Sequence, residues 1–196
     1  MKKPIAIMVV IHNDLQDYPR EKLYEDYFGW LKTELEDISG RPVFIHMSDK
    51  EDVTELSDYN YRNDDPGAAV MGWKQKTEEL YRSIYKQQSF HSGLVKILLL
   101  TRYNIDETLW GLLGGVAGVT FMRSYAAIAA ITSRNAPAHE IGHMLGATHE
   151  DSEVHFAGWW QDSVMLADPA SPFRGNSYKF SEKNRQNMRE YLENFP

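Results

Sequence analysis

Apolar residues follow two different spacings along the chain. Continuous apolar runs, which are typical of buried strands, cover residues 4–11, 43–47 and 94–100. Between them, residues 20–38 and 69–88 carry apolar side chains three or four positions apart, as on one face of a helix. The order strand, helix, strand, helix, strand predicts a mostly parallel sheet connected by right-handed crossovers.

Two further strands and a helix are predicted after this unit. Residues 112–122, "LLGGVAGVTFM", are glycine-rich and then extended. Residues 124–132 form a strand of small side chains, which would let another element pack closely against it. A helix then begins after Asn135, which suits an N-cap, with Pro137 tolerated in the first turn.

Polar segments and a terminal helix complete the pattern. Residues 48–68 are polar and predict a long surface loop. Residues 150–178 show no clear periodicity and contain "DPASPFRGN", which indicates a second loop. Residues 180–192 predict the last helix, with Ser181 as its N-cap and Asn184 where a complete capping box has Glu or Gln.

Composition excludes several classes of protein. The 196 residues suit one domain, and 42% hydrophobic and 12% aromatic content argues against disorder. The net charge of −7 and the lack of a long basic run argue against nucleic-acid binding. No apolar run reaches the length of a membrane span. The chain has no cysteine, so disulfides and Cys-ligated metals are excluded. We expect a monomer.

The N-terminus partly resembles a secretion signal, because Lys2 and Lys3 precede an apolar run. The run is short, contains β-branched residues and stops at "HND" without a small-residue cleavage site, so a buried first strand is favoured. The compartment stays open between secretion, as a mature domain or by a signal-less route, and the cytoplasm.

The stretch "HEIGHMLGATH", residues 139–149, contains three of the seven histidines. His139 and His143 are four residues apart, which places both imidazoles on one face of a helix, close enough to share one zinc ion. Glu140 projects about 100° round the helix, too far to be a third ligand but able to reach a metal-bound water.

Gly146 and His149 extend this pair. A glycine three residues past His143 is a good helix stop, after which the chain can turn and bring His149 back as a third nitrogen ligand. Three protein ligands leave a fourth position for water, which is the mark of a catalytic zinc site. The alternative is a helix with surface histidines or a relict site that no longer binds metal.

The motif H-E-x-x-H-x-x-G-x-x-H resembles that of the metzincin clan of zinc endopeptidases. Those proteins place a methionine turn beneath the metal, and Met165 in "DSVML" is the candidate here. The resemblance implies an α/β (α+β) fold over one catalytic domain, residues 1–196. Its upper lobe, residues 1–149, would hold a twisted, mixed, mostly parallel sheet with helices, including the active-site helix. Residues 150–196 would form a smaller lobe with the methionine turn and C-terminal helix.

The subfamily stays open. The stretch "HEIGHMLGATHED" is most similar to the adamalysin (reprolysin) type, yet Glu150 directly after the third histidine is an astacin feature, followed by Asp151. The astacin tyrosine two residues beyond the methionine is absent, since Ala167 stands there. The lack of cysteine excludes cysteine-switch latency. No pro-segment precedes the first strand, so we expect a chain made active or the catalytic part of something longer.

The resemblance implies a zinc-dependent endopeptidase with one catalytic Zn²⁺, in which Glu140 acts as general base on the zinc-bound water. A peptide or protein substrate would lie extended and pair with an edge strand formed by Ala117, Gly118, Val119 and Thr120. The loop 150–174 would form the wall of the main pocket. Three aromatic residues in it either line that pocket or pack internally: Trp159, Trp160 and Phe173.

Two other functions are considered. One is a catalytically silent interaction module that keeps the fold with a structural zinc, and the other is an exported bacterial effector or toxin protease. Glu140 favours an enzyme, because a structural site needs no carboxylate at that position. The acidic residues between 51 and 65 could serve calcium, but a solvated loop is the better interpretation. The remaining histidines are interpreted as surface or core residues: His12, His46, His91 and His155.

Overall fold

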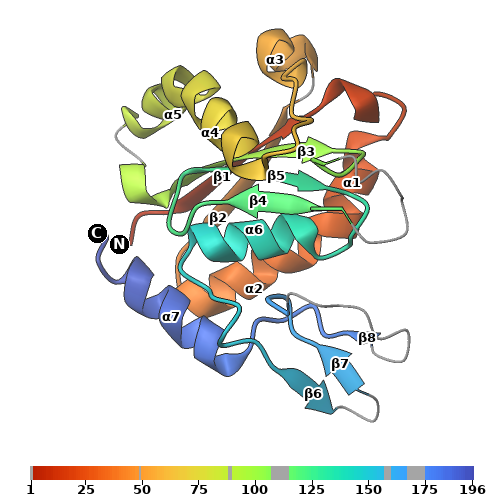
Figure 1. The fold of residues 1–196 in the computed structure, drawn as a ribbon. Coiled ribbons are helices and arrows are strands. Elements are labelled where there is room, and N and C mark those ends of the chain that lie inside the picture. The colour runs from red at the N-terminus through yellow and green to blue at the C-terminus, as the bar shows by residue number, and fades with distance from the viewer. Residues whose placement is uncertain (1, 49, 88–89, 107–114, 157–159, 167–174) are drawn as a thin grey trace.

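The protein is described from a computed structural model (Figure 1), which describes residues 2–48, 50–87, 90–106, 115–156, 160–166 and 175–196. A five-stranded sheet with the strand order β2-β1-β3-β5-β4 forms its centre. The strands are β1 (Ile5–Ile11), β2 (Val43–Ser48), β3 (Val95–Thr101), β4 (Gly118–Thr120) and β5 (Ala126–Ala130). All neighbours are parallel except β4, which runs antiparallel to β5 with Gly118 opposite Ala129.

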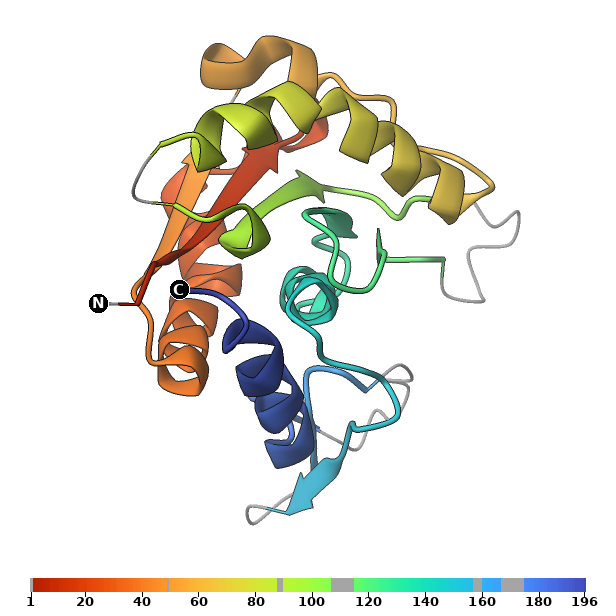
Figure 2. The ribbon, with the colours of Figure 1, turned by 90° about the vertical axis from the view of Figure 1, so that its left-hand side faces the viewer.

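Helices cover both faces of this sheet, as Figures 1 and 2 show. Below it in Figure 1 lie α2 (Gly29–Ser39), α6 (Ala136–Met144) and α7 (Glu182–Leu192), with α1 (Arg20–Tyr27) towards the rear. Above it lie α3 (Lys50–Ser57), α4 (Pro66–Lys76) and α5 (Glu78–Tyr85). Two short 3₁₀ helices, η1 (Asn13–Leu15) and η2 (Ser92–Leu94), lie next to β1 and β3.

The alternation of side chains along each strand produces two separate cores. In β1, Ile7 and Val9 pack with α2, α6 and α7, whereas Val10 packs with α4 on the opposite face. In β5, Ala127 faces the α6 side and Ile128 the α4 side. Strands buried on both faces explain why the sequence shows continuous apolar runs rather than strict alternation. The small residues of β5 allow α6 to pack closely, as their size predicts.

The parallel sheet, its covering helices and the antiparallel edge strand confirm the predicted fold class. Three segments are more divided than the sequence pattern predicts. Residues 20–38 form two helices, α1 and α2, which meet at Phe28. Residues 69–88 are divided between α4 and α5 at Thr77, and the predicted loop 48–68 contains α3. The helical spacing of apolar residues does not reveal the two helix breaks, because the two helices of each pair pack against the same core.

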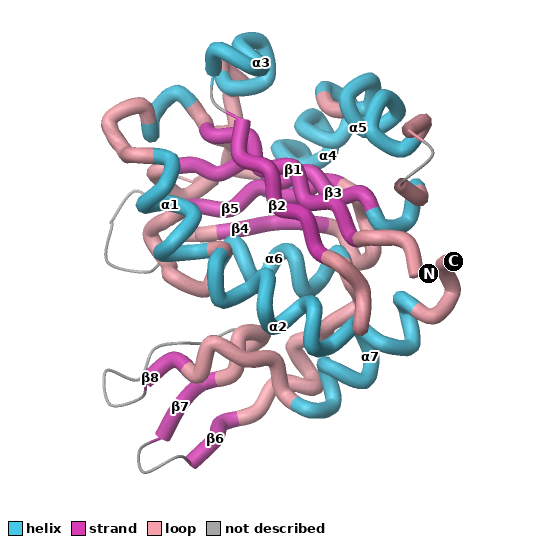
Figure 3. Tube along the Cα trace, turned by 180° about the vertical axis from the view of Figure 1, so that it is seen from behind, coloured by secondary structure: helices cyan, strands magenta, loops and turns pink. Residues whose placement is uncertain are grey.

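A second, three-stranded sheet replaces part of the loop predicted for residues 150–178. Its strands are β6 (Val154–Phe156), β7 (Trp160–Asp162) and β8 (Gly175–Asn176), and Figure 3 shows them below α2 and α7. These strands have only two or three residues each, too short to show a period-two pattern. Within the part of the chain that the structure describes, no helix is long and apolar enough to cross a bilayer.

The chain ends lie side by side (Figure 1), and the N–H of Lys3 donates to the carbonyl of Pro196 at 2.9 Å. Arg41, which is only 3% exposed, donates from its guanidinium to the carbonyls of Lys3, Leu192, Phe195 and Pro196. A charged donor satisfied by several carbonyls fixes the end of α7 against the first strand.

Lys96, the second residue of β3, is a charged residue in the core, only 1% exposed. Its ammonium donates to the carbonyl of Ser124 at 3.0 Å and lies over the Tyr191 ring. Burial lowers the pKa of Lys96 to about 7. In the unfolded chain a lysine titrates near pH 10.4, so between these values the unfolded state binds more protons and the free energy of unfolding rises with pH.

We expect Lys96→Met to increase the free energy of unfolding near pH 6, where the buried ammonium costs most. The gain over wild type should shrink as the pH rises from about 7 to about 9.5, because the wild-type lysine becomes neutral in the fold. Urea denaturation of the metal-free protein across this range measures the difference. Lys76→Met, at a side chain that is 43% exposed, is the control and should show no such pH-dependent gain.

Candidate metal centre

Helix α6 carries the first two histidines and starts directly below the carboxyl end of β5. Pro137 lies in its first turn, where a missing N–H costs no helical hydrogen bond. Asn135 precedes the helix, but its side chain makes no cap; its Oδ1 accepts from the Nδ2 of Asn176 instead. Asn135 is thus the N-cap residue, as predicted, but it makes no side-chain capping bond, because a partner in β8, distant in sequence, holds its side chain.

His139 and His143 lie one helical turn apart, and a carbonyl orients each ring. The Nδ1 of His139 lies 3.0 Å from the carbonyl of Val164, and the Nδ1 of His143 lies 2.9 Å from the carbonyl of Ala147. A carbonyl oxygen can only accept, so each Nδ1 carries the proton and each Nε2 keeps its lone pair. Both rings are thereby held in the tautomer that can ligate a metal through Nε2.

Gly146 reverses the chain after the helix. It has a φ of +100°, which L side chains rarely adopt, and its N–H donates to the carbonyl of His143 at 3.1 Å. A Cβ at this position would lie 3.2 Å from the Cβ of Tyr191 on α7. The turn therefore requires a glycine for its conformation, and α7 lies tightly against it.

After this turn His149 returns to the other two histidines. Its Nε2 lies 2.8 Å from the Nε2 of His139 and 2.9 Å from the Nε2 of His143. Both helical histidines present lone pairs, whereas His149 can place at most one proton between them. A cation shared by all three nitrogens removes this conflict, and three imidazoles are a donor set that zinc accepts. Within the described residues, these histidines are the one group of three or more candidate ligands gathered closely enough for an ion.

The surroundings keep the two imidazoles of α6 neutral. Burial lowers the pKa of His139 to about 4, with a further contribution from the neighbouring His143. Burial also lowers the pKa of His143. Neutral imidazole is the form that binds metal, so the rings on α6 need not lose a proton to do so at neutral pH.

Glu140 is 5% exposed, and its carboxylate lies against the edge strand. A Cβ added to Gly118 in β4 would lie 2.6 Å from Oε1 and 2.7 Å from Cγ of Glu140. The edge strand therefore passes directly over the carboxyl group, and only glycine leaves room for it. Burial raises the pKa of Glu140 to about 8.

Met165 lies in a tight turn that packs against α6. The N–H of Leu166 donates to the carbonyl of Ser163 at 3.1 Å, which closes the turn, and Met165 is fully buried. A Cβ at Gly142 would lie 2.7 Å from the sulfur of Met165, so the sulfur packs directly on the helix between His139 and His143. The carbonyl of Val164 in this turn is the one that orients His139.

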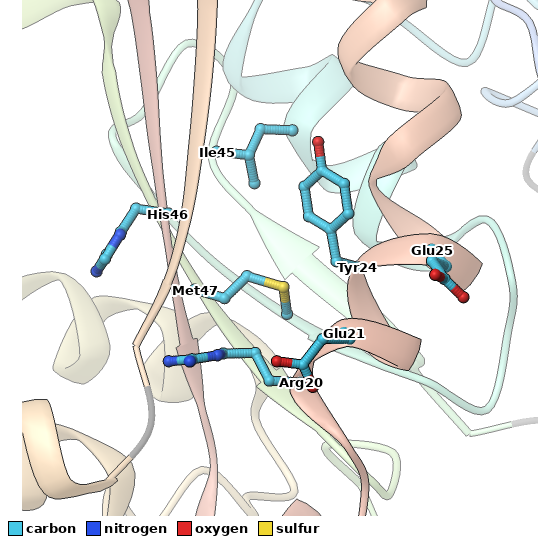
Figure 4. Close-up of a pocket in the computed structure, with 7 residues that line it drawn as sticks. All are labelled: Arg20, Glu21, Tyr24, Glu25, Ile45, His46 and Met47. Carbon is cyan, nitrogen blue, oxygen red and sulfur yellow. The ribbon is translucent and has the colours of Figure 1, made fainter.

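Other predicted positions fall in different places. Trp159, Ala167 and Phe173, and the side chain of Trp160, lie outside the described residues. His12 contacts the carbonyl of Tyr59, and the ring of His91 lies next to Phe195. His46 lines a cavity of about 500 Å³ between α1 and β2, with Tyr24, Ile45 and Met47 along its apolar wall (Figure 4). This cavity lies at the opposite edge of the sheet from β4, so the histidine cluster is not part of it.

Several contacts of the centre were missed by sequence reasoning. The carbonyls of Val164 and Ala147 leave no signature, because every residue has a carbonyl. Gly118 and Gly142 are close-approach glycines, and only the glycine-rich character around residue 118 hinted at one of them.

No protein-family model and no curated protein sequence matches the chain. Among solved structures, it is similar to the crystal structure of metalloproteinase-II from Bacteroides fragilis, with a TM-score of 0.63 and 19% sequence identity. The match covers 97% of this chain and 53% of that one, so the chain spans about half the length of that protein. At this identity the likeness concerns the fold, which is metalloproteinase-like.

We expect the protein to bind one zinc ion per chain. Substituting His143→Ala should lower the affinity more than about 100-fold, the upper range for losing only a partner that orients a ligand. The affinity should also fall steeply as the pH approaches about 4, where His139 takes up a proton in competition with the metal. Competition with a chromophoric chelator at several pH values measures both effects.

The matched control is His46→Ala at the opposite edge of the sheet, which should leave zinc affinity and stoichiometry unchanged. Equal loss in both variants, or an affinity indifferent to pH down to 4, would count against the three-histidine centre.

Proposed function

We propose that the chain is a zinc-dependent endopeptidase that hydrolyses peptide bonds. The single observation that carries this proposal is the buried Glu140 carboxyl group, which lies beneath an edge strand on the helix that carries two of three converging imidazoles. A metalloproteinase-like fold over nearly the whole chain supports it.

Zinc would be held by the Nε2 atoms of His139, His143 and His149, with Met165 packed beneath them. When bound there, it supplies a Lewis acid and lowers the pKa of a water towards about 7. The carbonyls of Val164 and Ala147 hold two of the rings in the ligating orientation, as their hydrogen bonds to Nδ1 indicate.

Glu140 transfers the proton in this proposal. It follows His139 on α6 and its carboxyl is nearly excluded from water, which raises its pKa to about 8. A carboxyl group with a pKa near the working pH can both accept a proton from the attacking water and return it to the leaving amine. Keeping a carboxylate in so dry a place is costly, and a purely structural metal site would gain nothing from it.

The substrate would bind as an additional strand. β4 is the last strand in the sheet order, so one of its edges has no neighbouring strand within the described part of the chain. An extended peptide pairing with Ala117, Gly118, Val119 and Thr120 would pass over Glu140, because Gly118 contacts that carboxylate. Exposed apolar side chains flank the strand: Val116, Phe121 and Met122. They favour apolar side chains in the substrate.

We expect Glu140→Gln to lower kcat for peptide hydrolysis by about 10²–10⁴-fold, the contribution of a positioned general base. The amide keeps the size of the side chain but cannot accept the proton from water. One zinc per chain should remain, as measured by metal analysis alongside a peptide-library cleavage assay.

Glu150→Gln, at an exposed carboxylate directly after the third histidine, is the control and should keep full activity. Undiminished hydrolysis by Glu140→Gln would refute the mechanism. Zinc binding without hydrolysis in the wild type would favour a catalytically silent interaction module.

We expect Gly118→Ala to lower kcat strongly while zinc affinity stays within about twofold of wild type. The added methyl group would overlap the Glu140 carboxyl group and displace it. Gly29→Ala, where the nearest atom to the added methyl is 3.8 Å away, is the matched control. If Gly118→Ala remains fully active, Glu140 does not work from beneath the edge strand.

A further inference from the structure

The third histidine differs from the other two in how it is held. His139 and His143 take their positions from α6, which ends at Met144. His149 lies five residues further on, outside any helix or strand, and its ring is exposed. An exposed side chain on irregular backbone has little packing to hold it, so its position must be set through the backbone on either side.

The backbone before His149 is held by one side chain of α7. The Oδ1 of Asn184 accepts the N–H of Thr148 at 2.7 Å, and its Nδ2 donates to the carbonyl of Thr148 at 2.9 Å. Both polar backbone groups of the residue preceding His149 are thus paired with a single amide. The opposite orientation of the amide would place donor against donor and acceptor against acceptor, so the pairing fixes the orientation of Asn184.

The backbone after His149 is held by the same helix. The Oδ2 of Asp151 accepts from the Nδ2 of Asn187 at 2.6 Å and from the Oγ1 of Thr148 at 3.2 Å. The Oγ of Ser181, the N-cap of α7, donates to the carbonyl of Asp151. The segment carrying the third histidine is therefore tied to α7 on both sides.

Helix α7 is itself firmly placed. Met188 and Leu192 are buried in the core shared with the sheet and α6. Arg185 pairs with Glu34 and Asp37 of α2, and Glu34 is almost fully buried. A helix anchored in this way can fix the position of whatever its side chains hold.

Asn184 lies in the first turn of α7, at a position where other residue types are usual. It is the third residue after Ser181, where a capping box has Glu or Gln reaching back to the N-cap. Its N–H still donates to the Oγ of Ser181 at 3.1 Å, but its fully buried side chain turns to Thr148 instead. The side chain of Asn184 therefore does not return to the N-cap as in a complete capping box. It makes two hydrogen bonds to the segment that carries His149 instead.

We propose that Asn184 is a positioning residue for the metal centre, fixing His149 through the backbone of Thr148. This inference rests on the metal centre of the proposed function but not on hydrolysis. Its consequence is that the affinity for the metal depends on an amide of the C-terminal helix that hydrogen-bonds to Thr148 and not to any of the three histidines.

The test compares Asn184→Asp and Asn184→Ala with wild type, using zinc alone as the ligand. The aspartate keeps the size and the acceptor but sets an oxygen against the carbonyl of Thr148. We expect zinc affinity, measured by chelator competition, to fall about 10–100-fold in both variants. The visible spectrum of the Co²⁺-substituted protein should also change, because the ligand geometry is altered. Neither readout responds to a loss of stability alone while the protein stays folded, which circular dichroism verifies.

Gln186→Ala, at an exposed position of the same helix, is the matched control and should leave affinity and spectrum unchanged. Asn187→Ala is a milder second variant, removing only one hydrogen bond to Asp151, and should lower the affinity several-fold even if both Asn184 variants fail to fold. Unchanged zinc affinity in every folded variant, or an equal loss in Gln186→Ala, overturns the proposal.

Failure of this inference is distinguishable from failure of the proposed function. Wild-type protein that binds no zinc would overturn the metal centre and the role of Asn184 together. Zinc binding that depends on Asn184 but is accompanied by no peptide cleavage would uphold the positioning role and refute the peptidase.

Discussion

The rest of the structure depends on the close approach of three imidazole nitrogens. The Nε2 of His149 lies within 2.9 Å of the Nε2 of His139 and of the Nε2 of His143. Lone pairs directed at a common point repel one another, so the arrangement favours a shared cation and depends on a rigid frame. Different parts of the chain supply that frame: α6 for two rings, the turn around Met165 for the orientation of His139, and α7 for the segment of His149.

The frame is assembled by unusually close approaches of backbone. At Gly118 the edge strand touches the Glu140 carboxyl group, at Gly142 the sulfur of Met165 touches α6, and at Gly146 the chain turns against Tyr191. Each contact leaves no space for a Cβ without a neighbour moving. Of the three, Gly118 lies against Glu140, which is only 5% exposed.

The central sheet lies between α6 and α4 and is buried by helices on both faces. Its strands are mainly apolar, but β3 buries the charged Lys96. The ammonium of Lys96 donates to the carbonyl of Ser124 and lies over the ring of Tyr191 in α7. The turn containing Ser124 also carries Arg123, whose N–H donates to the carbonyl of His143. The buried ammonium of Lys96 therefore lies next to the segment that hydrogen-bonds to the C-terminal end of α6.

The sequence by itself determined the mostly parallel sheet and the face of α6 that carries His139 and His143, because these features depend on local periodicity and spacing. The edge strand near Gly118 was implied only by the family resemblance of the histidine motif. The sequence did not predict the division of two helices at Phe28 and Thr77 or the short strands β6, β7 and β8, since so few residues show no period. It placed Asn135 at the N-cap of α6 but did not predict the bond that its side chain makes to Asn176, and it left Asn184 as an incomplete capping box. Three contacts were decided only by the tertiary structure. Asn184 hydrogen-bonds to the backbone of Thr148, and the carbonyl of Val164 orients His139. Gly118 packs against the Glu140 carboxyl group. These contacts join segments distant along the chain, and a backbone carbonyl or a missing Cβ acts through position rather than residue type.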